Sequence, residues 1–150
     1  MPVCFAVSLN RRAHDSDFLG TRTLLSHPRT DDTIHWDQIE AWGGLHGLRS
    51  DDALESAIAQ PKNVYLYGGG DLYEIAAAYA FHIAESQAYL DGNKRTAFIS
   101  TVTFLSINGY EFVPGAETEA IPFVLSLYDN HEFRFEKLVP WLQKHVKPSV

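Results

Sequence analysis

An all-α fold is the class that this sequence predicts, on three observations. Apolar residues recur at helical spacing in several long segments, and Gly, Pro, Asn and Ser separate these segments. The 150 residues, 45% of them hydrophobic and 21% charged, suffice for one domain with a buried core. Strand candidates are confined to residues 62–67 and 110–113. We therefore expect a single-domain helical bundle with a short flap that could form a small β-hairpin.

The N-terminal part of the chain precedes the first predicted helix. Residues 1–32 carry scattered charge and no sustained hydrophobic period, so we expect an N-terminal extension of uncertain order. Asp31 and Asp32 are candidate N-caps, because a short carboxylate can accept bonds from the free N–H groups of a first helical turn. The helix should then run to about Trp42 and end at the glycine pair 43–44.

The second predicted helix begins after Ser50, which is followed by two acidic residues suited to a first turn. It should end near Gln60, because Pro61 disfavours helical backbone in the residue before it. Residues 62–67 then alternate Val and Leu with Tyr, a period of two that predicts a short extended segment. The three glycines at 68–70 close this segment with a flexible turn.

Four more helices are expected, over residues 71–86, 93–107, 117–128 and 136–146. The segment 93–107 is apolar on most of its circumference, so it should be a central, buried helix that ends at Asn108 and Gly109. Pro122 should be tolerated only near the first turn of its helix. Residues 147–150 are expected to form a tail.

Composition and charge exclude several classes of function. A formal net charge of −7 argues against general affinity for nucleic acid and is compatible with basic partners. The longest apolar stretches fall short of the roughly 20 residues of a membrane span. Cys4 is the single cysteine, so no intrachain disulfide can form, which suits a reducing cytosol. We therefore expect a soluble cytoplasmic protein with no nucleic-acid or membrane partner.

Residues 87–97, Gln-Ala-Tyr-Leu-Asp-Gly-Asn-Lys-Arg-Thr-Ala, join two predicted helices and place a glycine and charged residues at a helix start. A helix N-terminus offers unpaired N–H groups and partial positive charge, and Gly92 would let a phosphate approach them. Lys94 and Arg95 would neutralise the phosphate, and Asp91 is the hard oxygen ligand that Mg²⁺ prefers. The alternative is an ordinary Asn-capped helix with two solvated basic residues. Because basic residues oppose the helix dipole at this end, we favour the phosphate site.

The same residues resemble the Fic/Doc superfamily, and within it the death-on-curing branch, the toxins of toxin–antitoxin pairs. The family signature reads His-x-Phe-x-Asp-Gly-Asn-Lys-Arg-Thr-Ala. Residues 91–97 match its last seven positions in full, and Tyr89 stands where the family has Phe. The position of the signature His is occupied by Gln87. This position is the main departure from the pattern.

The resemblance covers about residues 33–146, which we take as the Fic/Doc domain. Residues 43–49 and 54–57 resemble early segments of the branch, and residues 61–68 resemble its flap. Adenylyl-transferring relatives carry a second Arg three residues after the motif Arg, where this chain has Phe98. That difference makes the chain resemble the death-on-curing branch more than the adenylyl transferases.

The resemblance implies a transferase that moves a phosphoryl or adenylyl group from ATP to a hydroxyl of a target protein. Asp91 would hold Mg²⁺, and the phosphates would be bound by the next four residues, namely Gly92, Asn93, Lys94 and Arg95. Gln87, at the position of the motif base, and Arg95 are the implied catalytic positions. The implied partners are a protein substrate, which is a translation factor for the founding toxin, and a cognate antitoxin.

Gln87 changes the chemistry, because the family His is understood to act as general base. A glutamine cannot accept a proton at ordinary pH, and its carbonyl can only orient a hydroxyl. General bases contribute about 10²–10⁴-fold, so we expect reduced or altered activity. His82 is a poor substitute, since five residues along a helix place it about 140° around and roughly 7.5 Å back along the axis.

Three hypotheses remain open at this point. The first is an ATP- and Mg²⁺-dependent protein-modifying toxin. The second is a module of the same fold that binds nucleotide or antitoxin and has lost catalysis. The third is a structural helical protein that uses the loop only as a cap. The third is disfavoured, because nothing structural requires Asp, Gly, Asn, Lys and Arg together. Gln87 alone separates the first two hypotheses, and it points toward the second. We rank the enzyme first because the rest of the motif is complete.

Overall fold

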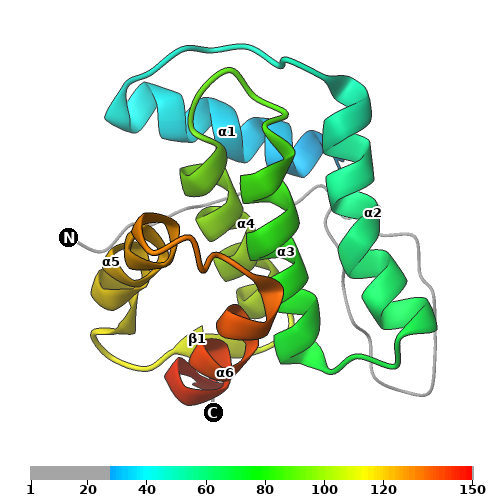
Figure 1. Cartoon of the computed structure of the whole chain (residues 1–150), viewed down its shortest axis with the longest axis vertical. Coiled ribbons are helices and arrows are strands. Elements are labelled where there is room, and N and C mark those ends of the chain that lie inside the picture. The colour runs from blue at the N-terminus through cyan, green and yellow to red at the C-terminus, as the bar shows by residue number, and fades with distance from the viewer. Residues whose placement is uncertain (1–27, 150) are drawn as a thin grey trace.

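The computed structural model describes residues 28–149, which form six helices and two short strands (Figure 1). In chain order these are α1 Pro28–Trp42, α2 Asp51–Tyr67, α3 Leu72–Ser86, α4 Asn93–Ile107, β1 Tyr110–Phe112, α5 Ala116–Asp129, α6 Phe135–His145 and β2 Val146–Pro148. The strands pair antiparallel, with Phe112 opposite Val146. The expected all-α class is therefore confirmed. Within residues 28–149 no helix is both long and apolar enough to cross a bilayer.

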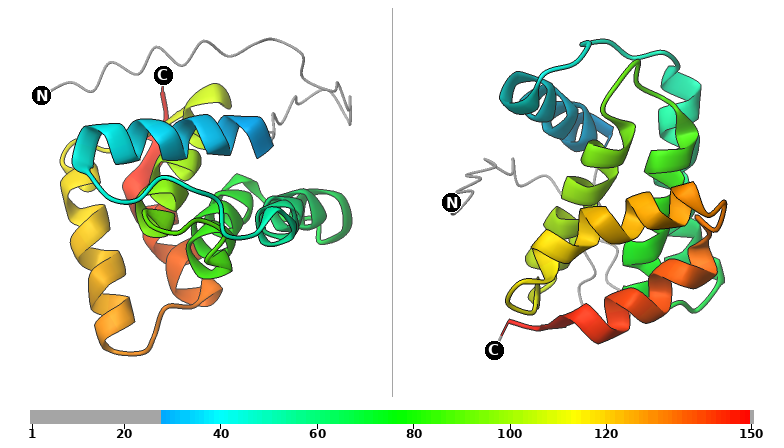
Figure 2. Two further views of the ribbon diagram at one scale, coloured as in Figure 1. Left: turned by 90° about the horizontal axis from the view of Figure 1, so that it is seen from above. Right: turned by 60° about the vertical axis from the view of Figure 1, so that its left-hand side comes forward.

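Helix α3 is the centre of the bundle, and its residues 75–79 are all buried. Three of these are alanines with no exposed surface, so neighbouring helices can approach the backbone closely. Helix α4 runs beside α3, and the rings of Tyr79 and Phe104 meet with centroids 5.0 Å apart. Helices α5 and α6 cover the front of this pair, and α1 crosses one end (Figure 2).

Helix α4 has the bounds and the burial that its sequence predicts. It begins at Asn93 and ends at Ile107, with Asn108 as its C-cap. Lys94 and Ser106 are its only exposed residues, and the others are buried or half-buried. The motif residues therefore stand at the start of a central helix, whose axis is held by the core.

The expected end of the second helix at Gln60 is wrong, because α2 continues through Pro61 to Tyr67. The extended flap predicted for residues 62–67 is thus helical. The alternation along the sequence does not match burial in the structure, because Leu66 and Tyr67 are exposed and burial follows one face of the helix. That face packs on the core through Ala57, Pro61, Val64 and Tyr65. The glycines do end the helix, and the Gly68 N–H bonds to the Asn63 carbonyl at 3.3 Å.

Other element ends also differ from expectation. Helix α1 begins at Pro28, so Asp31 lies inside the helix and not at its N-cap. The Asp31 carboxylate is fully buried and accepts a 2.6 Å bond from the Ser100 hydroxyl, which ties α1 to α4. Pro122 lies in the second turn of α5, where it is exposed, so water can bond the carbonyl that it leaves free. The predicted N-terminal extension lies, up to residue 27, outside the described residues.

The assignment of Ser50 as the N-cap of α2 can be tested directly. Ser50 accepts a 3.1 Å bond from the Ala53 N–H, so Ser50→Ala should lower the free energy of unfolding by about 0.5–2 kcal/mol. Ser56→Ala, on the exposed face of the same helix, is the control and should be neutral or slightly stabilising. Urea unfolding measures both, and equal midpoints for the two variants would contradict the assigned cap.

Candidate functional site

The motif loop, residues 87–92, reverses the chain between α3 and α4 through two left-handed residues. Gln87 has φ 51° and Gly92 has φ 76°. A side chain at Gly92 would also meet the Ile39 side chain at 3.2 Å, so packing against α1 favours glycine there. The loop is therefore shaped by its own backbone and by the helix beside it.

The Asn93 side chain closes the motif loop. Its amide donates to the Tyr89 carbonyl and accepts from the Tyr89 N–H, both at 3.0 Å. Asn93 is buried, so these two bonds are shielded from water. The side-chain amide of this predicted phosphate ligand is thus used inside the loop. A phosphate would therefore have to meet its backbone N–H, which belongs to the first turn of α4.

The connecting loop, residues 43–49 between α1 and α2, lies alongside the motif loop (Figures 1 and 2). The Leu90 N–H bonds to the Gly47 carbonyl at 3.0 Å, and the Arg49 N–H bonds to the Ala88 carbonyl at 2.6 Å. A Cβ on Gly44 would lie 2.6 Å from an Asp91 carboxylate oxygen, so only glycine allows this approach. The two loops therefore form one unit.

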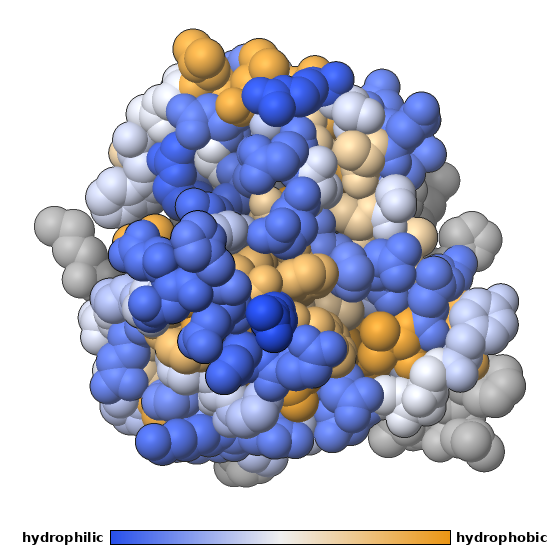
Figure 3. Space-filling view, in the orientation of Figure 1, coloured by the Kyte–Doolittle hydropathy of each residue, from blue (hydrophilic) through white to orange (hydrophobic). Residues whose placement is uncertain are grey.

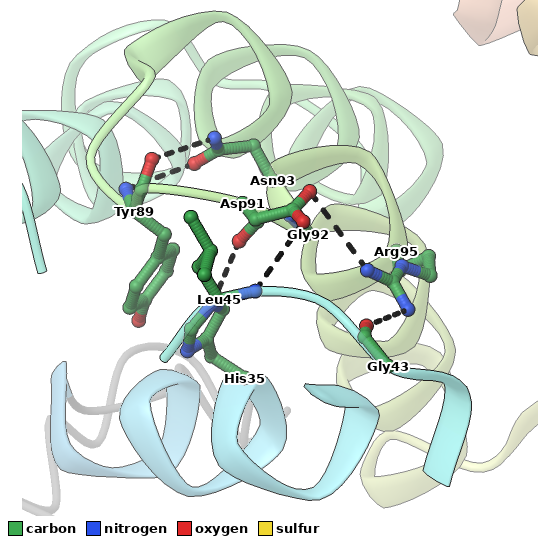
Figure 4. Close-up of polar contacts among 8 residues, drawn as sticks. All are labelled: His35, Gly43, Leu45, Tyr89, Asp91, Gly92, Asn93 and Arg95. Carbon is green, nitrogen blue, oxygen red and sulfur yellow. Dashed lines mark hydrogen bonds and ion pairs between the residues drawn. The ribbon is translucent and has the colours of Figure 1, made fainter. Parts of the chain in front are cut away.

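Asp91 and Arg95 lie at the edge of this unit, facing the connecting loop (Figure 4). The Asp91 carboxylate accepts from the Gly92 N–H at 2.8 Å and from the Leu45 N–H at 3.4 Å. Arg95 donates to the Gly43 carbonyl at 3.0 Å, and its other terminal nitrogen lies 4.0 Å from Asp91. The Asp91 and Arg95 side chains are 48% and 31% exposed, so a ligand can reach both.

The start of α4 suits an anion. Gly92 is its N-cap, and no side chain within the described part of the chain caps it. The N–H groups of a first helical turn lack partners inside the helix and carry partial positive charge. Residues 28–149 hold no cluster of three or more His, Cys, Asp or Glu residues suited to a metal. Asp91 is a single hard oxygen donor, which fits Mg²⁺, since this ion is usually bound by one or two carboxylates; Asp91 would be the residue that holds it.

Lys94 is not brought to this edge. Its ammonium lies 4.0 Å from the centre of the Tyr128 ring, on α5. The Tyr128 hydroxyl donates to Glu85 at 2.8 Å, and burial, together with this carboxylate, raises the pKa of the hydroxyl above its ordinary range. The structure therefore gathers Asp91, Gly92, Asn93 and Arg95, and it places Lys94 in a separate contact with an aromatic ring.

Gln87 is exposed at the end of α3, and its amide donates to the Ala84 carbonyl at 3.4 Å. This bond satisfies one of the last carbonyls of the helix. His82 is half-buried one turn earlier, beside the ring of Phe81, and burial lowers its pKa. Among the described residues, no hydrogen bond or ring contact joins His82 to the motif loop, which fits the expectation that it is a poor substitute for the base.

His35 is a residue of the site that sequence reasoning missed. Its ring stacks on Tyr89 with centroids 3.8 Å apart and planes 5° apart, and its Nε2 bonds to the Asp91 carbonyl at 2.7 Å. Burial lowers the pKa of His35 and raises that of Tyr89, whose hydroxyl donates to Asp32. In the sequence His35 is marked only as a polar residue on the buried face of α1. Its contact with Asp91 could not be predicted from local patterns, because 56 positions separate the two residues.

These features define a helical domain in which Asp91 and Arg95 flank the uncapped start of a central helix. A family model described as the Fic/DOC family matches residues 28–105, which is just over half of the chain. The chain therefore belongs to the Fic/DOC family, and the resemblance inferred from the motif is confirmed.

Two curated relatives carry names from the same branch. The chain is 39% identical over 74 residues to "Toxin Doc" of Mycolicibacterium smegmatis, across 47% of this chain and 56% of that protein. It is 32% identical over 85 residues to "Protein kinase doc" of Escherichia phage P1, across 56% of this chain and 68% of that protein. The match thus spans just over half of the first relative and two thirds of the second.

The Asn93 amide can be tested by its effect on stability. Asn93→Ala leaves the buried N–H and carbonyl of Tyr89 without partners, and each such group costs about 1–3 kcal/mol. We expect unfolding to become easier by at least about 2 kcal/mol in a urea titration. Asn63→Ala, an exposed position on α2, is the control and should change stability little. If Asn93→Ala were as stable as this control, the role of the Asn93 side chain in closing the motif loop would be refuted.

Proposed function

We propose that this chain is a Fic/Doc-type toxin of a toxin–antitoxin module, which transfers a phosphoryl or adenylyl group from ATP to a hydroxyl of a target protein. The observation that carries the proposal is the uncapped start of α4, beside which Asp91 and Arg95 are both partly exposed. The names of the two relatives, a toxin and a protein kinase, support it. By the same reasoning we propose a cytoplasmic location and a cognate antitoxin.

The charges at the site have complementary roles in this proposal. When bound, ATP would supply the transferable group, and Mg²⁺ would partly neutralise its phosphates. The N–H groups at the start of α4 bind phosphate oxygens, and the Arg95 guanidinium, oriented by the Gly43 carbonyl, adds a full positive charge. Asp91 holds the metal through a carboxylate that the Leu45 and Gly92 N–H groups orient. Such positioning and charge neutralisation dominate the catalysis of phosphoryl transfer.

The motif is more consistent with transfer of a phosphoryl group than with transfer of an adenylyl group. Phe98 stands where adenylyl-transferring relatives have a second motif Arg, and its ring packs on Phe112 with centroids 6.0 Å apart. No side chain at that position can therefore clamp a further phosphate. We infer that the chain holds ATP through one arginine of the motif, Arg95.

A protein acceptor suits the surface around the site. Exposed apolar side chains gather on α1 and on the two loops, and Figure 3 shows hydrophobic residues along the edge where the connecting loop runs. The exposed apolar side chains of α1 and the two loops include Trp36, Trp42, Leu45 and Leu90, which are 46–72% exposed. Exposed apolar patches of this kind mark sites of protein interaction. A hydroxyl presented by a bound protein would then meet Gln87 and not a base.

The second candidate is a module that binds nucleotide or antitoxin without catalysis. One specific observation favours it: Gln87 cannot take a proton, and its amide is bonded to the end of α3. His82, the nearest histidine along α3, makes no hydrogen bond to the motif loop among the described residues, so we do not assign it the role of the base. Gln87 therefore separates the two candidates in experiments as well.

Nucleotide binding tests the phosphate site. A charge-assisted bond to phosphate is worth about 1.5–3 kcal/mol, so Arg95→Ala should weaken ATP about 10- to 100-fold with or without Mg²⁺. Asp91→Ala should weaken ATP only when Mg²⁺ is present, because the carboxylate acts through the metal. Without metal, loss of the negative charge should leave ATP affinity equal or higher.

Isothermal calorimetry in Mg²⁺ and in chelator measures these four affinities. Asp52→Ala, which removes an exposed carboxylate from the first turn of α2, is the control and should bind like the wild type. Equal affinity for wild type, Asp91→Ala and Arg95→Ala in Mg²⁺ would remove the phosphate-site proposal.

Gln87→His tests catalysis. It restores a base at the family position and should raise transfer by up to about 10²–10⁴-fold, while Gln87→Ala should lower any residual transfer only modestly. The fold should tolerate the change, because His is enriched among residues with left-handed backbone and this position has φ 51°. Transfer is measured with α- and γ-labelled ATP on cell lysate, which also separates adenylyl from phosphoryl transfer.

The outcome decides between the two candidates. If neither the native chain nor the Gln87→His variant labels a protein, and neither slows growth when expressed without an antitoxin, the catalytic proposal fails. The site would then be assigned to binding of nucleotide or partner.

A further inference from the structure

His35 reaches the motif loop from α1, and both partners of the contact are buried. His35 is 4% exposed and Tyr89 is 2% exposed. The ring stacks on Tyr89, and its Nε2 bonds to the backbone carbonyl of Asp91, two residues further on. One side chain therefore contacts the motif loop at two points that flank Leu90.

We propose that His35 is a positioning residue, which fixes the backbone of Asp91 so that its carboxylate is oriented for Mg²⁺. The proposal rests on the proposed function for the metal, but its effect on the loop stands apart from that function. His35 itself touches neither nucleotide nor acceptor in this scheme and acts only through Asp91.

The hydrogen bond determines the state of the ring. A carbonyl only accepts, so Nε2 must carry the proton, and in a neutral imidazole the other nitrogen is then an acceptor. The parallel stack on Tyr89 sets the plane of the ring, and Nε2 lies at its edge toward Asp91. Ring plane and donor together therefore specify where the Asp91 carbonyl lies.

Tyr89 cannot easily move to release this constraint. Its hydroxyl donates to Asp32 at 2.9 Å, and its backbone is held by the two bonds to Asn93. Asp32 and His35 lie one turn apart on α1, so the helix holds both ends of the contact. The Asp91 backbone is thereby fixed relative to α1. Helix α1 is also bonded to α4, through Asp31 and Ser100.

A packing role alone would make a different prediction from a positioning role. If His35 only fills space, His35→Phe should be silent, because the ring and its stack remain. If its N–H positions Asp91, His35→Phe should weaken the binding of ATP in Mg²⁺. His35→Gln should restore part of that affinity, because its amide nitrogen can replace Nε2 as the donor. Partners that orient metal-binding groups typically contribute about 10–100-fold to metal affinity or activity.

The experiment measures ATP affinity in Mg²⁺ and in chelator for the full chain, His35→Phe and His35→Gln. We expect His35→Phe to lower affinity by about tenfold in Mg²⁺ and to leave affinity in chelator unchanged, with partial recovery in His35→Gln. His82→Phe, at a half-buried histidine on α3, is the control and should bind like the wild type in both conditions. Wild-type affinity of His35→Phe in Mg²⁺ would overturn the proposal.

Amide hydrogen exchange by NMR gives a second reading that needs no nucleotide. The Leu90 and Gly92 N–H groups, bonded to Gly47 and to Asp91, should exchange faster in His35→Phe than in His82→Phe. If the wild type does not bind ATP at all, the proposed function fails, and this measurement decides the inference about His35. Unchanged exchange at both amides would overturn it. If His35→Phe does not fold, His35→Gln decides, since loss of affinity in that variant as large as in Asp91→Ala would contradict the role of the N–H.

Discussion

The two hydrogen bonds between the Asn93 amide and the backbone of Tyr89 are the constraint on which the rest of the site depends. The side chain of the first residue of α4 thereby closes the preceding loop, and it is not available to cap the helix. The N-cap residue is Gly92, which has no side chain that could cap the helix. An N-terminus left uncapped in this way keeps its partial positive charge for a ligand. Loop closure and the anion binding that we propose therefore depend on one arrangement.

The connecting loop and α1 complete what Asn93 begins. Gly44 lets the backbone come close enough for the Asp91 carboxylate to meet the Leu45 N–H, and His35 bonds the Asp91 carbonyl from the other side. The carboxylate and the carbonyl of one residue are thus held by two different segments. Because α1 is also bonded to α4 through a buried carboxylate, the metal position that we propose is tied to the core of the bundle and not to a free loop.

Local features of the site were predictable from the sequence, and long-range ones were not. The bounds of α4, the Ser50 cap and the place of the motif at a helix start all follow from neighbours along the chain. The continuation of α2 through Pro61 did not, because tertiary burial of that face outweighs the local preference against helix. His35 was missed since its partners lie 56 residues away, and the use of the Asn93 amide was missed because a motif does not say which way a side chain turns.

Gln87 shows why fold and catalysis can separate in this domain. Its left-handed backbone ends α3, and the one hydrogen bond of its side chain to the residues from 28 to 149 is to the Ala84 carbonyl of that helix. Neither feature requires a group that titrates, and neither involves Asn93, His35 or the connecting loop. The bonds that hold Asp91 and Arg95 are consequently independent of whether position 87 carries a base. In this architecture the anion site that we propose does not depend on position 87, whereas the proposed transfer depends on that one exposed side chain at the end of the preceding helix.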